Sequence, residues 1–267
     1  MPELPEVESV RKKLLENIKN KQINFVKLYV PKSLRNYPKS RLSNLEGQKI
    51  VDVKRKGKYL VVETKDFFIG LHLRMEGKFF IENEIDSKHT IIVFGLGSKY
   101  LHFKDHRKFA TVDIFEKSKF KYEELKPIVD LGPEPWDTSF EYLKEKLQRR
   151  TAAIKSTLLD QKLMSGLGNI YVDEVLFRSK VSPLRPSNKV SDKEIKEILK
   201  YSRSVLKKSI ELNGTTIRSY ESLGNKGGFQ RLLKVHTKEG EACPTGEVVK
   251  KIRVGGRGTY YCPKYQK

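Results

Sequence analysis

Residues 59–73, Tyr-Leu-Val-Val-Glu-Thr-Lys-Asp-Phe-Phe-Ile-Gly-Leu-His-Leu, decide the fold class of the first half of this chain. The runs Tyr59–Thr64 and Phe67–Leu73 are rich in β-branched and aromatic residues, which is typical of strands. A succession of such short strands predicts a sandwich or barrel rather than alternating βαβ units. Runs of the same kind, separated by Gly, Asp or Asn, recur on both sides: Ile23–Val30, Ile50–Val53, Lys78–Ile81, Thr90–Phe94, Tyr100–Phe103 and Ala110–Phe115.

The segment in front of these strands has a helical pattern over residues 5–18. Pro5 suits the first turn of a helix, and Glu6 and Glu8 suit the positive end of the helix dipole. We therefore expect a β-sandwich with one flanking helix. The apolar residues that follow the spacing of one helix face are Val7, Val10, Leu14, Leu15 and Ile18.

Helices replace strands after Phe115. A capping-box spacing from Thr138 to Glu141 predicts a helix that ends near Gln148. The same spacing recurs from Ser191 to Glu194 and opens a long helix. The long helix is predicted to end near Leu212. Two shorter helices are predicted over 155–164 and 168–179.

These patterns predict an α+β chain with two main domains. The β-sandwich domain spans 1–130, and the breaker-rich segment Leu-Gly-Pro-Glu-Pro lies in a linker at 131–137. A helical domain follows at 138–233, and a β-hairpin ends the chain at 234–267. The strands of the hairpin, around a Gly-Gly turn, are Val248–Val254 and Thr259–Cys262.

Composition points to a polyanionic partner. The chain has 267 residues with 54 Lys and Arg against 33 Asp and Glu, which gives a net charge of +21. The basic residues are spread along the chain, so a folded surface is basic, although a lysine-rich surface without a ligand gives the same balance. No apolar run is long enough to span a membrane, and an N-terminus of acids and prolines is not a secretory signal. Two cysteines do not make a disulfide framework.

The N-terminus is a candidate chemical site. Removal of Met1 leaves Pro2 as a free secondary amine, and an α-amine has a pKa near 7.7–8.0 in model peptides. A useful fraction is therefore neutral and nucleophilic near pH 7, and can form an iminium on a sugar carbon. Glu3 can serve as acid and base beside it, and Glu6, one helical turn further, can hold Glu3 or the amine in place. Acids and prolines are also common in a first helical turn without any chemistry.

Several segments, in order, resemble one family. Pro-Glu-Leu-Pro-Glu-Val-Glu at residues 2–8 is similar to the start of the formamidopyrimidine-DNA glycosylase / endonuclease VIII family. Arg74 stands where that family has Gly in H-L-G-M-S/T-G, and His106 stands where it has Pro in D-P-R-R-F. The matching segments span nearly the whole chain and are Arg55–Leu60, His72–Gly77, Asp105–Phe109, Leu131–Pro135, Gly166–Tyr171 and Arg257–Cys262.

The resemblance implies a bifunctional DNA glycosylase and abasic-site lyase of base excision repair. Pro2 attacks C1′ of the damaged nucleotide, and Glu3 is the acid and base. The base leaves the helical stack because C1′ is unreachable inside a duplex. The family fold has a helix-two-turn-helix, with DNA in a basic cleft between the domains. Lys58 and Arg257 are implied to belong to the catalytic site and, with Asn169, to hold phosphates that flank the lesion. His72 and Lys155 are also expected to bind DNA, and Lys155 lies in the basic run Arg149–Lys155.

Other motif residues are implied to recognise the lesion. Met75, Arg107 and Phe109 match the residues that fill the gap left by the flipped base, and this set favours the branch acting on 8-oxoguanine and formamidopyrimidines. An apolar wedge and a flat ring replace lost stacking there, and arginine can bond the orphaned base. The alternatives are ordinary core packing for Met75 and Phe109 and a surface phosphate contact for Arg107, but their joint occurrence at motif spacing favours the functional interpretation. The residues expected in a mobile base-recognition loop are Thr215, Thr216, Gly227 and Phe229.

The terminal hairpin departs from the family. The four zinc-ligand positions are Cys243, Gly246, Cys262 and Tyr265, so two of four ligands are missing. Structural zinc needs four N or S ligands, so we predict a zincless finger, no metal and no cofactor. The two cysteines are then expected to be small buried hydrophobes.

The resulting hypothesis is a monomeric enzyme that acts on double-stranded DNA with damaged bases and has no membrane partner. We place it in the bacterial cytoplasm or nucleoid, or in the nucleus of a eukaryote. An endonuclease VIII-like enzyme for oxidised pyrimidines is one alternative. A non-catalytic nucleic-acid-binding relative is another, although a pure binder has no need of a free proline amine.

Overall fold

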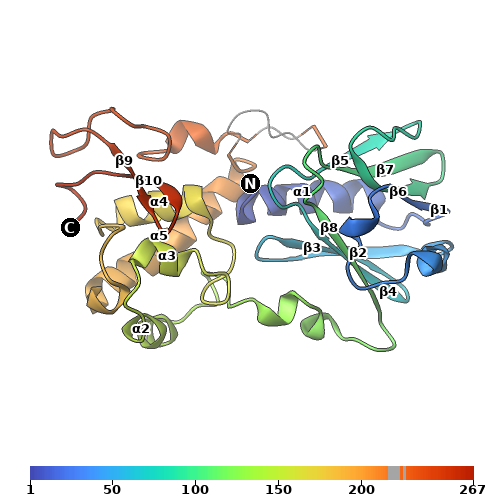
Figure 1. The fold of residues 1–267 in the computed structure, drawn as a ribbon, viewed down its shortest axis with the longest axis horizontal. Helices are drawn as coiled ribbons and strands as arrows, with labels where there is room; N and C mark the ends of the chain where they lie inside the picture. Colours follow the sequence, from blue (N-terminus) through green and yellow to red (C-terminus); the bar gives the residue numbers. More distant parts are fainter. Residues whose placement is uncertain (216–222, 225–226) are drawn as a thin grey trace. The chain divides into compact units, whose positions relative to one another are not determined.

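The structure, a computed structural model, describes residues 1–215, 223–224 and 227–267, which form two compact units (Figure 1). Unit 1 comprises Met1–Val129 with Asn213–Gly228, and unit 2 comprises Asp130–Leu212 with Phe229–Lys267. The hairpin at 234–267, predicted as a separate domain, is part of unit 2, and the segment after Leu212, predicted to belong to the helical domain, is part of unit 1. The described residues of that segment are hydrogen-bonded to unit 1, where Thr215 N donates to Glu6 and Leu223 N donates to the Phe79 carbonyl.

Unit 1 contains the predicted β-sandwich. Every strand pair in its two four-stranded sheets is antiparallel, and the eight predicted strands are all present. One sheet has the order β1 (Phe25–Leu28), β6 (Thr90–Leu96), β7 (Lys99–Lys104), β5 (Lys78–Glu82). The other has the order β2 (Ile50–Lys56), β3 (Tyr59–Thr64), β4 (Phe67–His72), β8 (Thr111–Glu116).

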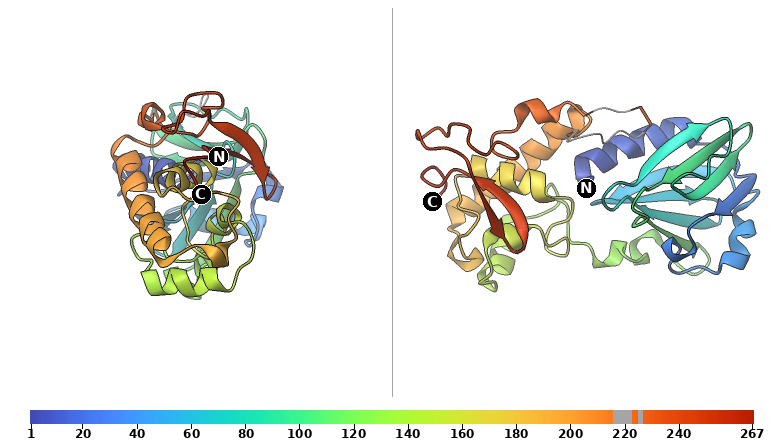
Figure 2. Two further views of the ribbon diagram at one scale, coloured as in Figure 1. Left: turned by 90° about the vertical axis from the view of Figure 1, so that its left-hand side faces the viewer. Right: turned by 45° about the horizontal axis from the view of Figure 1, so that its top comes forward.

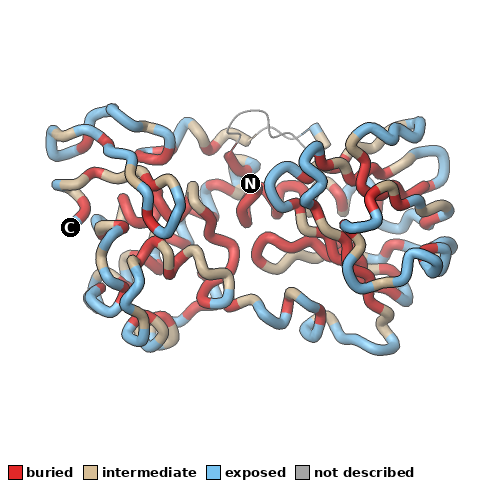
Figure 3. Tube along the Cα trace, in the orientation of Figure 1, coloured by how far each residue is buried: buried red, intermediate tan, exposed pale blue. Residues whose placement is uncertain are grey.

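Helix α1 (Leu4–Ile18) completes this unit, as the right-hand view in Figure 2 shows. Val7, Val10, Leu14 and Ile18 are buried in one apolar core with residues of both sheets. Burying such side chains contributes about 1.5–3 kcal/mol each, so packing fixes the helix against the sandwich. Figure 3 shows the buried stretches along α1 and the strands and the exposed stretches in the loops. Short 3₁₀ turns in this unit are η1 (Pro31–Ser33), η2 (Lys39–Leu45) and η3 (Tyr122–Glu124).

Unit 2 is helical. The predicted capping box of Ser191 and Glu194 is present at the start of α5. The cap of α2 is Ser139, which accepts from Tyr142 N, and not Thr138, whose hydroxyl donates to the Glu134 carbonyl at 2.9 Å. The helices are α2 (Phe140–Gln148), α3 (Ile154–Leu158), α4 (Asn169–Arg178) and α5 (Asp192–Glu211), with 3₁₀ turns η5 (Ser187–Lys189) and η6 (Phe229–Leu232). The 3₁₀ turn η4 (Ile128–Asp130) spans the boundary between the two units.

Helix α3 is shorter than predicted. The sequence indicated a helix to residue 164, but the Asp160 carboxylate accepts from Lys162 N, and the Gln161 amide donates to the Leu159 and Leu167 carbonyls. Such local side-chain bonds offer the backbone an alternative to helix. The chain therefore turns before it reaches α4.

The terminal hairpin consists of β9 (Lys250–Val254) and β10 (Arg257–Tyr261), as predicted. Gly255 and Gly256 both have positive φ, which a two-residue turn of this kind requires. A Cβ on Gly255 would lie 2.4 Å from Ser156 Oγ, so the hairpin tip approaches α3 closely. Within the described residues, no helix combines the length and apolar character of a bilayer span.

Candidate active site

The start of α1 positions the candidate nucleophile and acid. Pro2 is buried, and Glu3, the N-cap residue, is only 2% exposed. Met1, which precedes Pro2, is exposed. The Glu3 backbone N–H donates to Glu6 Oε2 at 2.8 Å. This hydrogen bond supports the prediction that Glu6 holds Glu3 in place.

The second oxygen of Glu6 holds the start of the predicted recognition loop. Glu6 Oε1 accepts from Thr215 N at 2.6 Å, and Thr215 is buried. Gly214 has φ +83°, and a Cβ there would lie 2.7 Å from the same oxygen, so only glycine fits. Thr216 lies outside the described residues, and Gly227 is half-buried near the far end of the segment.

Lys58 lies in the tight turn between β2 and β3, next to Gly57 with φ +55°. Arg55 Nη1 donates to the Gly57 carbonyl at 2.9 Å, and Arg55 Nε pairs with Glu8 of α1 at 2.9 Å. The turn is therefore fixed to the helix that carries Glu3. Lys58 itself is largely buried.

His72, at the end of β4, is a neutral hydrogen-bond donor. Burial, together with the positive charges of Arg74, Lys58 and Arg35, lowers the pKa of His72 to about 3. Its Nδ1 accepts from Arg74 N at 2.9 Å, so the ring proton is on Nε2. The ring packs edge-on against Tyr59, whose hydroxyl donates to Asp113. His72 can thus offer one N–H to a phosphate without a charge of its own.

His72→Asn is expected to reduce the acid sensitivity of unit 1. The unfolded chain takes up a proton on His72 below about pH 6.5, whereas the folded chain does so only near pH 3. Stability is therefore lost as pH falls through this window, and wild type should lose about 1 kcal/mol more than the variant between pH 6 and pH 5. The asparagine oxygen can keep the bond from Arg74 N. Urea unfolding, followed by amide exchange in β4, measures the free energy of unfolding of both proteins. A difference between them that is as large at pH 8 as at pH 5 would contradict the prediction.

The segment 105–110, here named the Asp105 loop, presents Arg107 and Phe109. Buried Asp105 accepts from the backbone of Arg107 at 3.0 Å and from those of Phe109 and Ala110 at 2.8 Å. Phe109 is 51% exposed, and the Arg107 guanidinium lies 4.8 Å from its ring centroid. Met75, in the turn before β5, is also exposed. Exposure of these side chains excludes the core-packing interpretation.

In unit 2, a hydrogen bond connects Asn169 to the hairpin residue that follows Arg257. Asn169 begins α4, and its Nδ2 donates to the Gly258 carbonyl at 2.9 Å. Arg257 is exposed at the hairpin tip, directly before Gly258. The helix terminus and the hairpin are therefore tied together at the residue next to Arg257.

Lys155 was predicted to contact DNA, and this is wrong for the structure described. Its side chain is 0% exposed and lies 2.7 Å from Asp173 Oδ1 and 3.0 Å from the Gly258 carbonyl. Asp173 Oδ2 also contacts His236 Nδ1 at 2.8 Å. Lys155 thus supports the hairpin from inside. Sequence reasoning missed Asp173, although an acid on the buried face of a helix would have been a signal.

Phe229 was predicted to lie in the recognition loop, and this is also wrong. It begins η6, is buried, and packs against Tyr171 of α4 with ring centroids 5.7 Å apart. A second unpredicted residue, buried Glu174, accepts from the backbone N–H groups of Lys234, Val235 and His236. Together these contacts fasten the segment after residue 228 onto α4.

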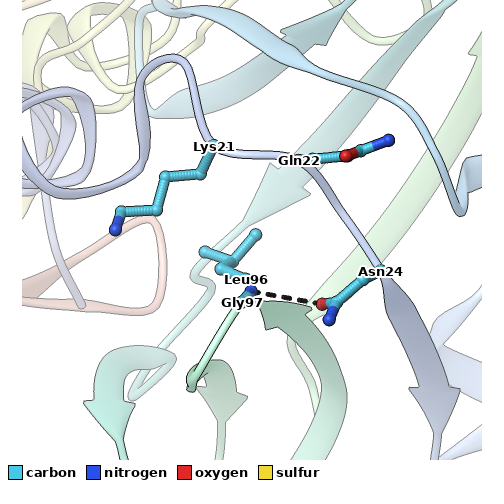
Figure 4. A pocket seen from close by; sticks show the side chains of 5 residues that line it. All are labelled: Lys21, Gln22, Asn24, Leu96 and Gly97. Carbon is cyan, nitrogen blue, oxygen red and sulfur yellow. Dashed lines mark hydrogen bonds between the residues drawn. The ribbon is translucent and has the colours of Figure 1, made fainter.

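A separate pocket of about 340 Å³ lies on unit 1. Figure 4 shows that Lys21, Gln22 and Asn24 line it with Leu96 and Gly97. Asn24 Oδ1 accepts from Gly97 N at 3.3 Å. None of the predicted site residues lines this pocket.

Known protein families and relatives match the chain that carries these residues. The formamidopyrimidine-DNA glycosylase N-terminal domain matches residues 1–112, and the H2TH domain of the same enzyme matches residues 131–221. The chain belongs to the formamidopyrimidine-DNA glycosylase family. Relatives of that name from Bacillus cereus and Listeria monocytogenes are 44% and 42% identical to it, over 98% and 100% of both chains.

Solved structures agree with this family assignment. A point mutant of Lactococcus lactis FPG in complex with Fapy-dG-containing DNA has a TM-score of 0.93 and 36% identity. The complex of Lactococcus lactis Fpg with abasic-site DNA gives the same two values. Both comparisons cover 100% of each chain.

The glycine that the family has at position 74 is explained by the backbone. Arg74 has φ +53°, in the left-handed region that favours glycine. Holding a non-glycine residue there costs of order 1 kcal/mol. The exposed arginine makes the bond to His72 through its backbone N–H, which glycine would supply equally well.

The zinc-binding hairpin of the family does not fit this chain. Cys243 and Cys262 form a disulfide, which corrects the prediction of two unlinked small hydrophobes. Glu247 brings a carboxylate oxygen within 4.8 Å of both sulfurs, but that carboxylate accepts from Lys264 N and Tyr265 N. Two mutually bonded sulfurs offer no thiolate, so the residues present lack the four ligands of a structural zinc.

Replacing both cysteines by serine is expected to destabilise unit 2 by about 3 kcal/mol. The disulfide closes a loop of 19 residues and removes that much chain entropy from the unfolded state. The only tryptophan of the chain, Trp136, belongs to unit 2, so its fluorescence in urea follows this unit. A reducing agent should reproduce the loss in wild type, and a chelator should not. A loss of stability that the chelator causes and the reducing agent does not would contradict the presence of the disulfide.

Proposed function

We propose that this chain excises oxidised purines, namely 8-oxoguanine opposite cytosine and formamidopyrimidines, from duplex DNA and then cleaves the strand at the abasic site. The observation that carries the proposal is the buried Glu3 carboxylate directly after Pro2, at the start of α1. Full-length family membership supports base excision as the reaction. The relatives with solved complexes bind Fapy-dG and abasic-site DNA, which supports the substrate class.

The chemistry starts after Met1 is removed, because the nitrogen of Pro2 is otherwise an amide without a free lone pair. The Pro2 nitrogen forms a bond to C1′ while the bond from C1′ to the base breaks, and the base leaves with the proton that the Pro2 amine gives up. Glu3 protonates the ring oxygen of the sugar, and ring opening gives an iminium between Pro2 and C1′. The Glu3 carboxylate then acts as base in the β- and δ-eliminations that release the two phosphates.

The remaining residues are assigned to DNA. Lys58 and neutral His72 from unit 1 donate to phosphates near the lesion, and Asn169 and Arg257 from unit 2 do the same. Charged donors to phosphate are strong, and the N-terminus of α4 adds its dipole. Met75 and Phe109 replace lost stacking, and Arg107 bonds the orphaned base.

The location and metal content follow from the same proposal. A DNA substrate places the enzyme at the nucleoid of a bacterial cytoplasm, and fractionation with chromosomal DNA tests this. The proline amine performs the covalent step, so the reaction needs no cofactor, and the hairpin is held without zinc. Metal analysis of the active protein tests both statements.

Borohydride trapping on duplex DNA with 8-oxoguanine opposite cytosine tests the function. Wild type should form a covalent adduct, and Pro2→Gly, which lacks the secondary amine, should form at least about tenfold less. Pro5→Ala is the matched control, because it removes a proline from the same helix turn without touching the terminal amine. N-terminal sequencing of the untrapped protein should begin at Pro2, whereas the trapped protein should be blocked to sequencing because its terminal nitrogen carries the sugar.

The other outcomes separate the alternatives. Trapping on an abasic site and on thymine glycol, but not on 8-oxoguanine, would indicate an enzyme for oxidised pyrimidines. Binding to DNA without trapping on any substrate would leave only a nucleic-acid-binding relative.

A further inference from the structure

We propose that His106 is a positioning residue that holds the Asp105 loop by packing on His89, and thereby sets the choice of opposite base. This inference rests on the proposed function. It concerns the position where the chain has histidine in place of the proline typical of its family. The loop carries Arg107, the residue assigned to the orphaned base.

The Asp105 loop is attached to the sandwich by two contacts at its first residues. Asp105 N donates to the His89 carbonyl at 2.8 Å. The imidazole of His106 lies against that of His89, with ring centroids 4.4 Å apart and 46° between the planes. His89 directly precedes β6 and is half-buried, so it provides a fixed surface.

The backbone N–H groups of the rest of the loop bond within the loop itself. The Asp105 carboxylate binds three backbone N–H groups within the loop, and its carbonyl accepts from Lys108 N at 3.1 Å. These bonds fix the shape of the loop, and its far end is anchored by Ala110, which is buried in the apolar core of unit 1. Lys108 has φ +55°, so the turn is also tightly bent. At the first residues of the loop, the contacts with His89 provide the corresponding anchor.

Orientation matters because Arg107 and Phe109 are exposed. Neither is enclosed by core side chains, and they contact each other at 4.8 Å. Proline at position 106 would fix φ and stiffen the loop entry. Histidine leaves φ free, and its ring contact with His89 supplies the restraint from outside the loop. A small displacement of a positioning group can cost orders of magnitude in rate.

The expected effects concern selectivity more than chemistry. His106→Ala should lower the ratio of kcat/KM for 8-oxoguanine opposite cytosine to that opposite adenine by about three- to tenfold, as expected for loss of an aromatic contact. Cleavage of a preformed abasic site should stay within twofold of wild type. His106→Phe, which keeps a flat ring, and His106→Pro, which fixes φ, should each restore the ratio. His89→Ala should resemble His106→Ala.

Phe120→Ala is the matched control. It removes another exposed aromatic ring of unit 1, which packs on Phe115 with centroids 5.4 Å apart at the opposite end of β8. It should leave the opposite-base ratio unchanged. Thermal melting of every variant identifies any that fail to fold.

Failure of this inference differs from failure of the proposed function. Wild type inactive on 8-oxoguanine opposite cytosine would overturn the function. Active wild type with an unchanged ratio in His106→Ala would overturn the positioning role. So would a His106→Phe variant as impaired as His106→Ala, because the ring would then not be the cause.

Discussion

Glu3→Gln should slow release of the damaged base by a factor of about 10²–10⁴, the usual contribution of a positioned acid or base. Glutamine has the size of glutamate but cannot give up a proton to the sugar or take one back. Its oxygen can still cap α1, and the Glu3 backbone bond to Glu6 does not involve the substituted side chain. The variant should therefore fold normally and bind DNA with affinity within about threefold of wild type.

Single-turnover measurement of base release, with DNA binding measured in parallel, isolates the chemical step. Glu16→Gln is the control, since it places the same substitution on the exposed far turn of α1, where Glu16 pairs with Lys13. It should match wild type in both assays. Base release by Glu3→Gln within threefold of wild type would remove Glu3 from the mechanism.

Asp173→Asn should destabilise unit 2 by about 3 kcal/mol or more. The substitution leaves the ammonium of Lys155, which is fully buried, without its anionic neighbour. Removing one partner of a buried ion pair typically costs about 3–5 kcal/mol, because the remaining charge is desolvated. Urea unfolding followed by Trp136 fluorescence measures the loss.

The double variant Lys155→Met, Asp173→Asn separates charge burial from packing. It removes both charges and keeps side chains of similar length, so it should be more stable than Asp173→Asn alone. Its DNA binding should still be weaker than that of wild type, because the Gly258 carbonyl beside Arg257 loses a donor. A single variant within 1 kcal/mol of wild type would show that the ion pair contributes little.

Much of the fold could be predicted because its signals are local. Alternating and β-branched runs gave all eight strands of the sandwich, and the Ser191 capping box correctly placed the start of α5. Local signals also explain one small error. Thr138 and Ser139 are adjacent hydroxyl residues, and only the geometry shows that Ser139 caps α2.

The errors concern contacts between residues distant in sequence. Lys155 appeared in a basic run, and nothing near it reveals that Asp173, eighteen positions later, lies beside it in the core. The disulfide joins residues 19 apart that both lie outside the two strands of the hairpin. The placement of the segment after Leu212 depends on Glu6, more than 200 residues earlier. Pattern and composition carry no information on such pairs.

The carboxylate of Glu6 connects two parts of the site whose sequences could otherwise change independently. The two oxygens of Glu6 bind Glu3 N and Thr215 N, so the proposed acid and the entry to the recognition loop share a single support. A loop altered to accept a new lesion therefore transmits any shift of Thr215 to the reaction centre. Gly214, pressed against the same carboxylate, closes the nearest position to variation. New substrate ranges in this lineage should arise beyond Thr215, where sequence change leaves the shared support intact.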